Sequence, residues 1–84
     1  MKITVKTVEW LRHHLPGDPT DNQAEMDVAQ DATPESVIAQ LALSSDHHYA
    51  VEINGTLVPQ SEHGSQGLAA GDVLTILPEP KVGM

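Results

Sequence analysis

The strongest signal in the sequence is a single capped amphipathic helix. Thr33 stands where an N-cap belongs, Pro34 takes the first helical position, and Glu35 adds a favourable negative charge to the first turn. Apolar side chains then recur at helical spacing and predict one buried face, formed by Val37, Ile38, Leu41 and Ala42. We expect this helix to end near Ser44–Asp46. One helix must bury its apolar face against other elements, which the alternating segments of the chain can supply.

Alternating segments before the helix predict two paired strands. Residues Lys2–Val8 place apolar side chains at alternate positions, which is typical of a half-buried strand. Ala24–Gln30 repeats this alternation more weakly, so we expect the two segments to form an antiparallel pair. Between them, apolar residues at helical spacing predict a short helical stretch at Glu9–Leu15, and breaker-rich residues predict a loop at Pro16–Gln23.

Three shorter strands are predicted after the helix. Tyr49–Ile53 and Thr56–Val58 flank Asn54-Gly55, a dipeptide that strongly favours a two-residue hairpin turn. After a loop and a turn, Val73–Leu77 is predicted to be the last strand, and Pro78 to end it. The order of elements predicts one α+β domain, with one main helix packed across a mixed sheet of four to five strands.

Charge and composition restrict the class of partner. The 84 residues carry twelve acidic and four basic side chains, for a formal net charge of −8, and the bases do not cluster. Phosphate binding needs clustered Lys and Arg, so we expect no nucleic-acid partner. The acidic surface favours a basic protein partner or serves solubility alone. The chain has no cysteine and no apolar run of the roughly 20 residues that a membrane span needs, so we expect a cytoplasmic protein without disulfides.

No segment carries a recognisable catalytic or metal-binding pattern. The five histidines include the adjacent pairs His13-His14 and His47-His48, a spacing that points neighbouring side chains in different directions, and we expect them to be solvated. The sequence has no HExxH motif, phosphate loop or nucleophile elbow. So small a domain has little room for a pocket of about 300 Å³. We therefore expect neither a metal site nor an autonomous enzyme.

The last predicted strand carries apolar residues on both faces. Strand geometry places Leu74 and Ile76 on one face and Val73, Thr75 and Leu77 on the other. If the first pair faces the helix, Val73 and Leu77 lie on the open face of the sheet, where they would form a contact for a protein partner. The alternative is that they are isolated exposed apolar residues, which are common on protein surfaces.

The order and spacing of four segments resemble a known family. VKTVEWLRHHLP (Val5–Pro16) is similar to an opening strand followed by a short helix, and ATPESVIAQL (Ala32–Leu41) to a Thr-capped main helix. VEINGTLVP (Val51–Pro59) is similar to a hairpin of the VNG-xx-VP type, and LAAGDVLTILPEPKVGM (Leu68–Met84) to a closing strand and tail. Together they resemble the MoaD/ThiS family of small sulfur-carrier proteins, which share the ubiquitin-like β-grasp fold.

This resemblance implies a function at the C-terminus. In the family, a partner enzyme uses ATP to adenylate the C-terminal carboxylate, and sulfur then replaces the adenylate to give a thiocarboxylate. A second enzyme, a sulfur-accepting synthase, takes the sulfur for a product of the molybdopterin or thiamine type. The chain itself would be a protein substrate and not an enzyme, and it would bind no cofactor. Its residues 1–78 would form the β-grasp domain and residues 79–84 a flexible tail.

The tail departs from the family pattern at its last residue. Where the family ends in Gly-Gly, this chain has Gly83-Met84, with Lys81 and Val82 lining the tail before them. The activated carboxylate would belong to Gly83 after a protease removes Met84, or to Met84 itself if the partner's tunnel is wide enough. A third interpretation is a β-grasp interaction module or subunit without chemistry at the terminus. A cloning artefact is a fourth explanation of Met84.

Overall fold

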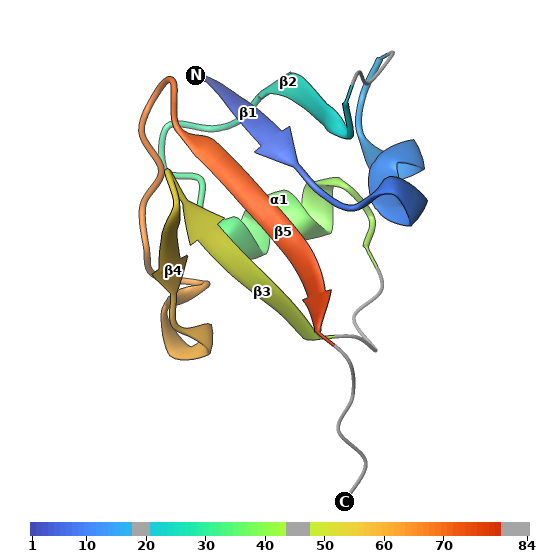
Figure 1. Cartoon of the computed structure of the whole chain (residues 1–84). Coiled ribbons are helices and arrows are strands. Elements are labelled where there is room, and N and C mark those ends of the chain that lie inside the picture. The colour runs from blue at the N-terminus through green and yellow to red at the C-terminus, as the bar shows by residue number, and fades with distance from the viewer. Residues whose placement is uncertain (18–20, 44–47, 80–84) are drawn as a thin grey trace, which may run out of the picture.

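The described part of the chain, residues 1–17, 21–43 and 48–79 of a computed structural model, forms a five-stranded sheet with one α-helix packed across it (Figure 1). Two short 3-10 helices, η1 and η2, complete it. In chain order the elements are β1 (Lys2–Lys6), η1 (Glu9–His14), β2 (Gln23–Asp27), α1 (Pro34–Gln40), β3 (His48–Ile53), β4 (Thr56–Val58), η2 (Gln60–Glu62) and β5 (Val73–Glu79). No helix in these ranges has the length and apolar character needed to span a membrane.

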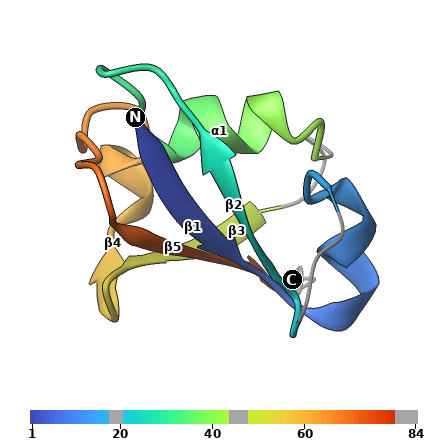
Figure 2. The same cartoon turned by 90° about the horizontal axis from the view of Figure 1, so that it is seen from above.

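The strands lie in the order β2-β1-β5-β3-β4. β1 and β5 pair in parallel, with β5 at the centre of the sheet, and the other neighbouring strands are antiparallel. α1 crosses one face of the sheet and leaves the other face open (Figures 1 and 2). The predicted α+β fold, a mixed sheet with one main helix across it, is therefore confirmed, as is the antiparallel pairing of the first two strands.

The core lies between α1 and the inner face of the sheet. Its most deeply buried aliphatic side chains come from β1, α1, β3 and β5: Ile3, Val5, Val37, Val51, Leu74 and Ile76. On β1 the buried residues alternate with more exposed ones, the period-2 pattern that predicts this strand. η1 and the residue after it close one end of the core with Leu11 and Leu15.

α1 begins as its sequence predicts. Thr33 Oγ1 accepts a hydrogen bond from the Ser36 backbone N–H at 3.3 Å, and Ser36 Oγ accepts one from the Thr33 backbone N–H at 2.9 Å. These two bonds form a capping box, and Pro34 stands at the first helical position. The start of the helix is therefore determined by residues that are close together in the sequence.

The end of α1 differs from the prediction. The helix stops at Gln40 and not near residues 44–46. Leu43 N donates to Ile38 O at 3.2 Å and Ala42 N to Ala39 O at 3.0 Å, the two bonds of a Schellman motif. Ala42 takes the left-handed position with φ +58°, where glycine is usual, and it is exposed rather than on the buried face as predicted. Because Leu43 is buried in the core, the packing of its side chain holds the chain in this early turn.

The first two strands end earlier than predicted. β1 lacks the last two predicted residues and β2 the last three. The register pairs Lys2 with Asp27, so β2 has no partner strand beyond that residue. At the other end of β1, Thr7 leaves the ladder, and its hydroxyl donates to the Ile76 carbonyl oxygen at 2.8 Å. The pairing of the strands, and not their apolar pattern alone, sets their length.

Pro78 does not end β5, contrary to the prediction. The strand continues to Glu79, and Pro78 lies opposite Tyr49 of β3. The pairing of β5 with β1 stops at Thr75, so proline's missing N–H costs no ladder bond on that side. Proline would interrupt a strand that pairs with other strands on both sides, but it is tolerated here because β5 pairs only with β3 at this position.

The β3–β4 hairpin is tied to the turn that leads into β5. Asn54 and Gly55 have φ values of +52° and +86°, the left-handed conformations that a tight hairpin turn requires. Asn54 Nδ2 donates to Asp72 Oδ1 at 3.0 Å, and Asn54 Oδ1 accepts from Val73 N at 2.9 Å. Asp72 Oδ2 accepts from Ala69 N at 2.8 Å. Two turns that are distant in the sequence therefore share one hydrogen-bond network.

Candidate functional site

The open face of the sheet carries the residues predicted as partner contacts. Along β5, Leu74 and Ile76 are completely buried on the helix-covered face. Val73, Thr75 and Leu77 alternate with them, and all three are half-buried on the opposite face. The predicted division of this strand into an inner and an outer set is therefore confirmed.

Val73 and Leu77 share this face without forming one patch. Four residues of a strand span about 13 Å, and the polar Thr75 lies between them. Leu77 lies opposite Ala50 of β3, so it has an apolar neighbour. Val73 lies opposite Thr4 of β1, a polar neighbour. The two predicted contact residues thus belong to opposite ends of the same face.

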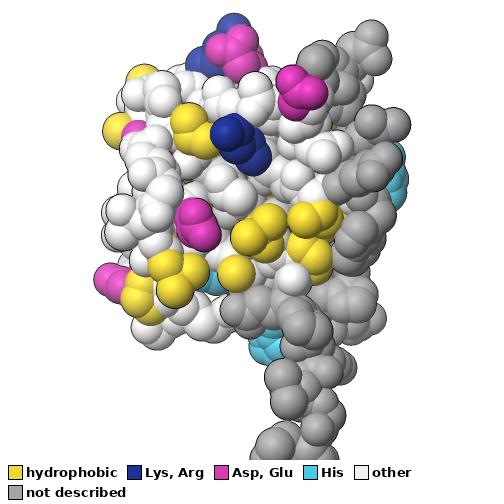
Figure 3. Space-filling model, in the orientation of Figure 1, with side chains coloured by type: hydrophobic (Ala, Val, Ile, Leu, Met, Phe, Trp, Pro, Cys, Tyr) yellow, Lys and Arg dark blue, Asp and Glu magenta, His cyan; other side chains and the backbone are white. Residues whose placement is uncertain are grey.

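Leu57 is a third apolar residue on this face, and the sequence prediction omitted it. It is 65% exposed and lies opposite Glu52 in the β3–β4 hairpin. The two-residue turn at Asn54-Gly55 fixes this register, so the hairpin signal suffices to place Leu57 on the same face as Glu52. Figure 3 shows hydrophobic side chains in separate groups on this face, one near the C-terminal end of β5 and another over β4.

Charged side chains separate these apolar contacts. Glu52 of β3 is half-buried between Thr75 of β5 and Leu57 of β4. Lys6 of β1 is exposed and lies opposite Thr75 on its other side. Lys2 of β1 and Glu25 and Asp27 of β2 add further charges to the same face. The face therefore combines small apolar contacts with groups of both charges, an arrangement that suits recognition by a protein surface of complementary charge.

Most of the predicted tail, residues 80–84, lies outside the described residues. These residues include Lys81 and Val82 of the tail and the modified end that the resemblance assigns to Gly83 or Met84. They follow Glu79, the last residue of β5 and of the described part of the chain. Glu79 itself, assigned to the tail by the predicted boundary, pairs with His48 of β3. The chain leaves the sheet two residues after Leu77. Among the outward-facing residues of β5, Leu77 is therefore the apolar one that lies nearest to the tail along the chain.

Two histidines contradict the prediction that these side chains are solvated. His14 is half-buried, and its Nδ1 lies 3.1 Å from the Leu41 carbonyl oxygen. His63 is only 6% exposed, and its Nε2 lies 3.2 Å from the Val58 carbonyl oxygen. Both rings therefore bind backbone carbonyl groups and join separate elements. Among residues 1–17, 21–43 and 48–79, no group of three His, Asp or Glu side chains is placed to hold a metal ion.

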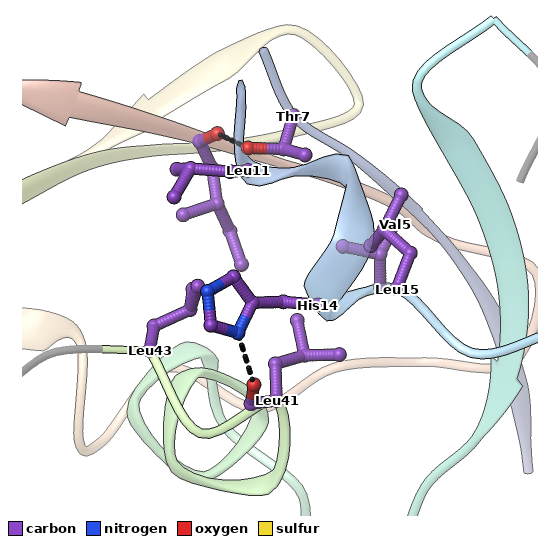
Figure 4. A pocket seen from close by; sticks show the side chains of 8 residues that line it. Val5, Thr7, Leu11, His14, Leu15, Leu41 and Leu43 are labelled. Atoms are coloured by element: carbon purple, nitrogen blue, oxygen red, sulfur yellow. Dashed lines mark hydrogen bonds between the residues drawn. The ribbon is translucent and has the colours of Figure 1, made fainter. Parts of the chain in front are cut away.

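A niche between η1, the end of α1 and the sheet is filled by its own side chains (Figure 4). It leaves essentially no volume for even a water-sized molecule. There the Thr7 hydroxyl donates a hydrogen bond to the Ile76 carbonyl oxygen, and the His14 ring nitrogen contacts the Leu41 carbonyl oxygen. The niche is therefore part of the packed core and not a ligand site.

The chain matches one family of known proteins in sequence and two solved structures in fold. A family model described as the ThiS family matches residues 6–79. Two crystal structures from Haloferax volcanii are similar to this chain. The structure of SAMP1 has 21% sequence identity to this chain and a TM-score of 0.62, and the match covers 99% of this chain and 100% of SAMP1. The structure of small archaeal modifier protein 1 has 22% sequence identity to this chain and a TM-score of 0.67, and the match covers 94% of this chain and 98% of that one. The likeness confirms the predicted ubiquitin-like β-grasp fold. No curated protein sequence matches the chain.

Proposed function

The chain belongs to the ThiS family, and on this basis we propose that it is a sulfur carrier activated at its C-terminus by a partner enzyme. The family match carries the proposal, because it spans the chain from the end of β1 to the end of β5, the strand that leads into the tail. In this role the chain is a protein substrate, and its partners supply the catalysis.

The folded body would supply docking, and the tail would supply the reacting group. Leu77 and Ala50 lie together on the open face near the point where the chain leaves the sheet. A partner that covered them would bury apolar surface, at about 25 cal/mol per Å², while the tail entered its active site. Val73 would add a second contact beyond Thr75. An adenylating enzyme related to ubiquitin-activating enzymes is the kind of partner with which this family works.

The first chemical step would form a mixed anhydride. A carboxylate oxygen at the C-terminus attacks the α-phosphorus of ATP, the bond from that phosphorus to the bridging oxygen breaks, and pyrophosphate leaves. A hydrosulfide equivalent then attacks the carbonyl carbon, AMP leaves, and a thiocarboxylate remains. A sulfur-accepting synthase would take this sulfur for a product of the molybdopterin or thiamine type.

The reacting residue would be Gly83 after removal of Met84, or Met84 itself, with Lys81 and Val82 lying in the partner's channel. Glycine suits the position next to the reacting carbonyl because it has no side chain and a free backbone conformation. Methionine would require a wider channel.

The experiment combines the purified chain, its cognate adenylating enzyme and ATP. Three forms are compared: the whole chain, the chain without Met84, and the chain without residues 81–84. We expect ATP–pyrophosphate exchange with one or both of the first two forms and none with the third. Addition of a sulfide donor and an alkylating reagent should then add one alkyl group to the C-terminal peptide. Alkylation is needed because methionine oxidation nearly matches a sulfur-for-oxygen exchange in mass. Absence of exchange with every form would contradict the proposal.

A second candidate function is protein binding without chemistry at the terminus. The observation that favours it is that Leu57 and Leu77 already stand on the sheet surface, independently of the tail. Deletion of residues 81–84 separates the two functions. A carrier would lose its function completely, whereas an interaction module would keep binding its partner with nearly unchanged affinity.

A further inference from the structure

A hollow at the outer edge of the sheet lies beside the β3–β4 hairpin, away from Leu77. It opens to solvent and has a volume of about 340 Å³. Its apolar side is formed by Ile53, Leu57, Val58 and Pro59, and its polar side includes Glu62 and Gln66. Leu57 is the most exposed large apolar side chain among the described residues. A concave apolar surface with a few polar groups at its rim is typical of a binding site for a small group or side chain.

Hydrogen bonds hold the walls of this hollow in place. Glu62 N donates to Pro59 O at 2.9 Å, which closes the η2 turn. The buried His63 ring contacts the Val58 carbonyl oxygen at 3.2 Å and so ties η2 to β4. The His63 carbonyl oxygen accepts from Glu35 N at 2.8 Å, which ties the same turn to α1. The hollow is therefore preformed, and little ordering of the protein would oppose binding.

The surroundings of the hollow are acidic. Glu62 lines it, and Glu52 lies opposite Leu57 across the hairpin. The sequence has no Lys or Arg between Arg12 and Lys81, so β3, β4 and η2 contain none. We propose that the hollow binds an extended segment of a partner protein in which an aliphatic side chain is flanked by Lys or Arg. A second copy of this chain would bring the same charge, −8, and is disfavoured as the occupant.

The hollow lies at the other end of the sheet from the tail. Ile53 pairs with Leu74, whereas the strand ends at Glu79, five residues further along β5. At the usual rise of a strand this separation is about 16 Å. A segment in the hollow and a partner at the tail can therefore be bound together, and the hollow provides an attachment that does not depend on chemistry at the terminus.

Peptide selection on the intact chain tests the proposal. A display library of random short peptides is panned against the whole protein, and the enriched peptide is synthesised and titrated by fluorescence anisotropy and amide NMR. We expect the enriched sequence to contain an aliphatic residue beside Lys or Arg, and the NMR shifts to concentrate on residues 56–62 and Gln66. Leu57→Ser should weaken binding about tenfold or more, because it removes the apolar wall.

A charge-matched pair of variants tests the electrostatic part. Glu62→Lys should weaken binding about fivefold or more relative to Glu25→Lys, which makes the same change in net charge at an exposed position on β2. Leu57 and Glu62 are exposed, so neither variant disturbs the core, and thermal unfolding of each variant verifies this.

Three results would overturn the proposal. They are the absence of any enriched peptide, enrichment of acidic peptides, and a peptide whose binding is lost in Leu77→Ser but retained in Leu57→Ser. The last result would place the peptide on the sheet face near the tail. Because the titration uses neither ATP nor an adenylating enzyme, its outcome is independent of whether the chain carries sulfur.

Discussion

Ile76 and Leu77 are neighbours on β5, but they belong to opposite surfaces of the sheet. Ile76 is completely buried on the helix-covered face, whereas Leu77 is half-buried on the open face opposite Ala50. Both side chains are aliphatic, so hydrophobicity does not distinguish them; their position along the strand does. One face of the strand therefore stabilises the fold, and the other remains available to a partner.

The largest effect should come from truncating the inner face. Leu74→Ala removes a side chain that is 0% exposed, and we expect it to lower the free energy of unfolding by about 2–5 kcal/mol. Leu77→Ala, the same change on the open face, should cost about 1 kcal/mol or less. Urea unfolding followed by circular dichroism measures both. Equal losses would contradict the assignment of the two faces.

The next effect concerns the network that joins the hairpin to β5. Asp72→Ala leaves Asn54 Nδ2 and Ala69 N without their side-chain acceptor, so we expect a loss of about 1–3 kcal/mol. Asp31→Ala makes the same change of charge at an exposed position and should cost about 0.5 kcal/mol or less. Thermal unfolding of the two variants gives the comparison. If Asp31→Ala were as destabilising as Asp72→Ala, net charge and not the network would be responsible.

A smaller effect, of opposite sign, is expected at the end of α1. Ala42→Gly places glycine at φ +58°, where a side chain is strained, and should stabilise the protein by about 0.5–1 kcal/mol. Ala39→Gly makes the same substitution at an exposed position within the helix and should destabilise by about 0.5–1 kcal/mol. Differential scanning calorimetry detects both shifts. Destabilisation by both variants would show that the left-handed turn carries no strain.

The smallest effect on stability should come from Leu57→Ala. This side chain is 65% exposed, so its truncation should change the free energy of unfolding by about 0.5 kcal/mol or less. The same urea unfolding series used for Leu74→Ala provides the measurement. A loss of the size expected for Leu74→Ala would mean that Leu57 packs against the fold and is not free to bind a partner.

Much of the fold follows from signals between near neighbours. The Thr33 cap, the Asn54-Gly55 turn and the alternation along β5 involve residues within a few positions of one another, and the structure confirms all three. The errors arose where distant residues decide. The early end of α1 depends on the burial of Leu43, and the continuation of β5 through Pro78 depends on where β1 stops pairing.

The candidate site likewise has features that local sequence predicts and features that depend on distant residues. The outward position of Val73 and Leu77 follows from strand parity, and that of Leu57 follows from the register of a two-residue turn. The burial of His63 was not predictable, because it depends on how the turn at η2 packs between β4 and α1. A histidine among Gly, Ser and Glu in a polar segment carries no local sign of burial.

By itself, the sequence determined the order of the five strands, the short helical stretch and the main helix, the acidic charge, and the residues of β5 that share a face. Local propensity and strand parity depend on residues a few positions apart, and net charge depends on composition, so all three can be read from the sequence without a structure. Only the tertiary structure decided that Asn54 and Asp72 share one network, that β5 tolerates a proline, and that a preformed acidic hollow lies beside Leu57. These features arise between segments far apart in the chain, and they exist only once strand pairing and packing have brought those segments together.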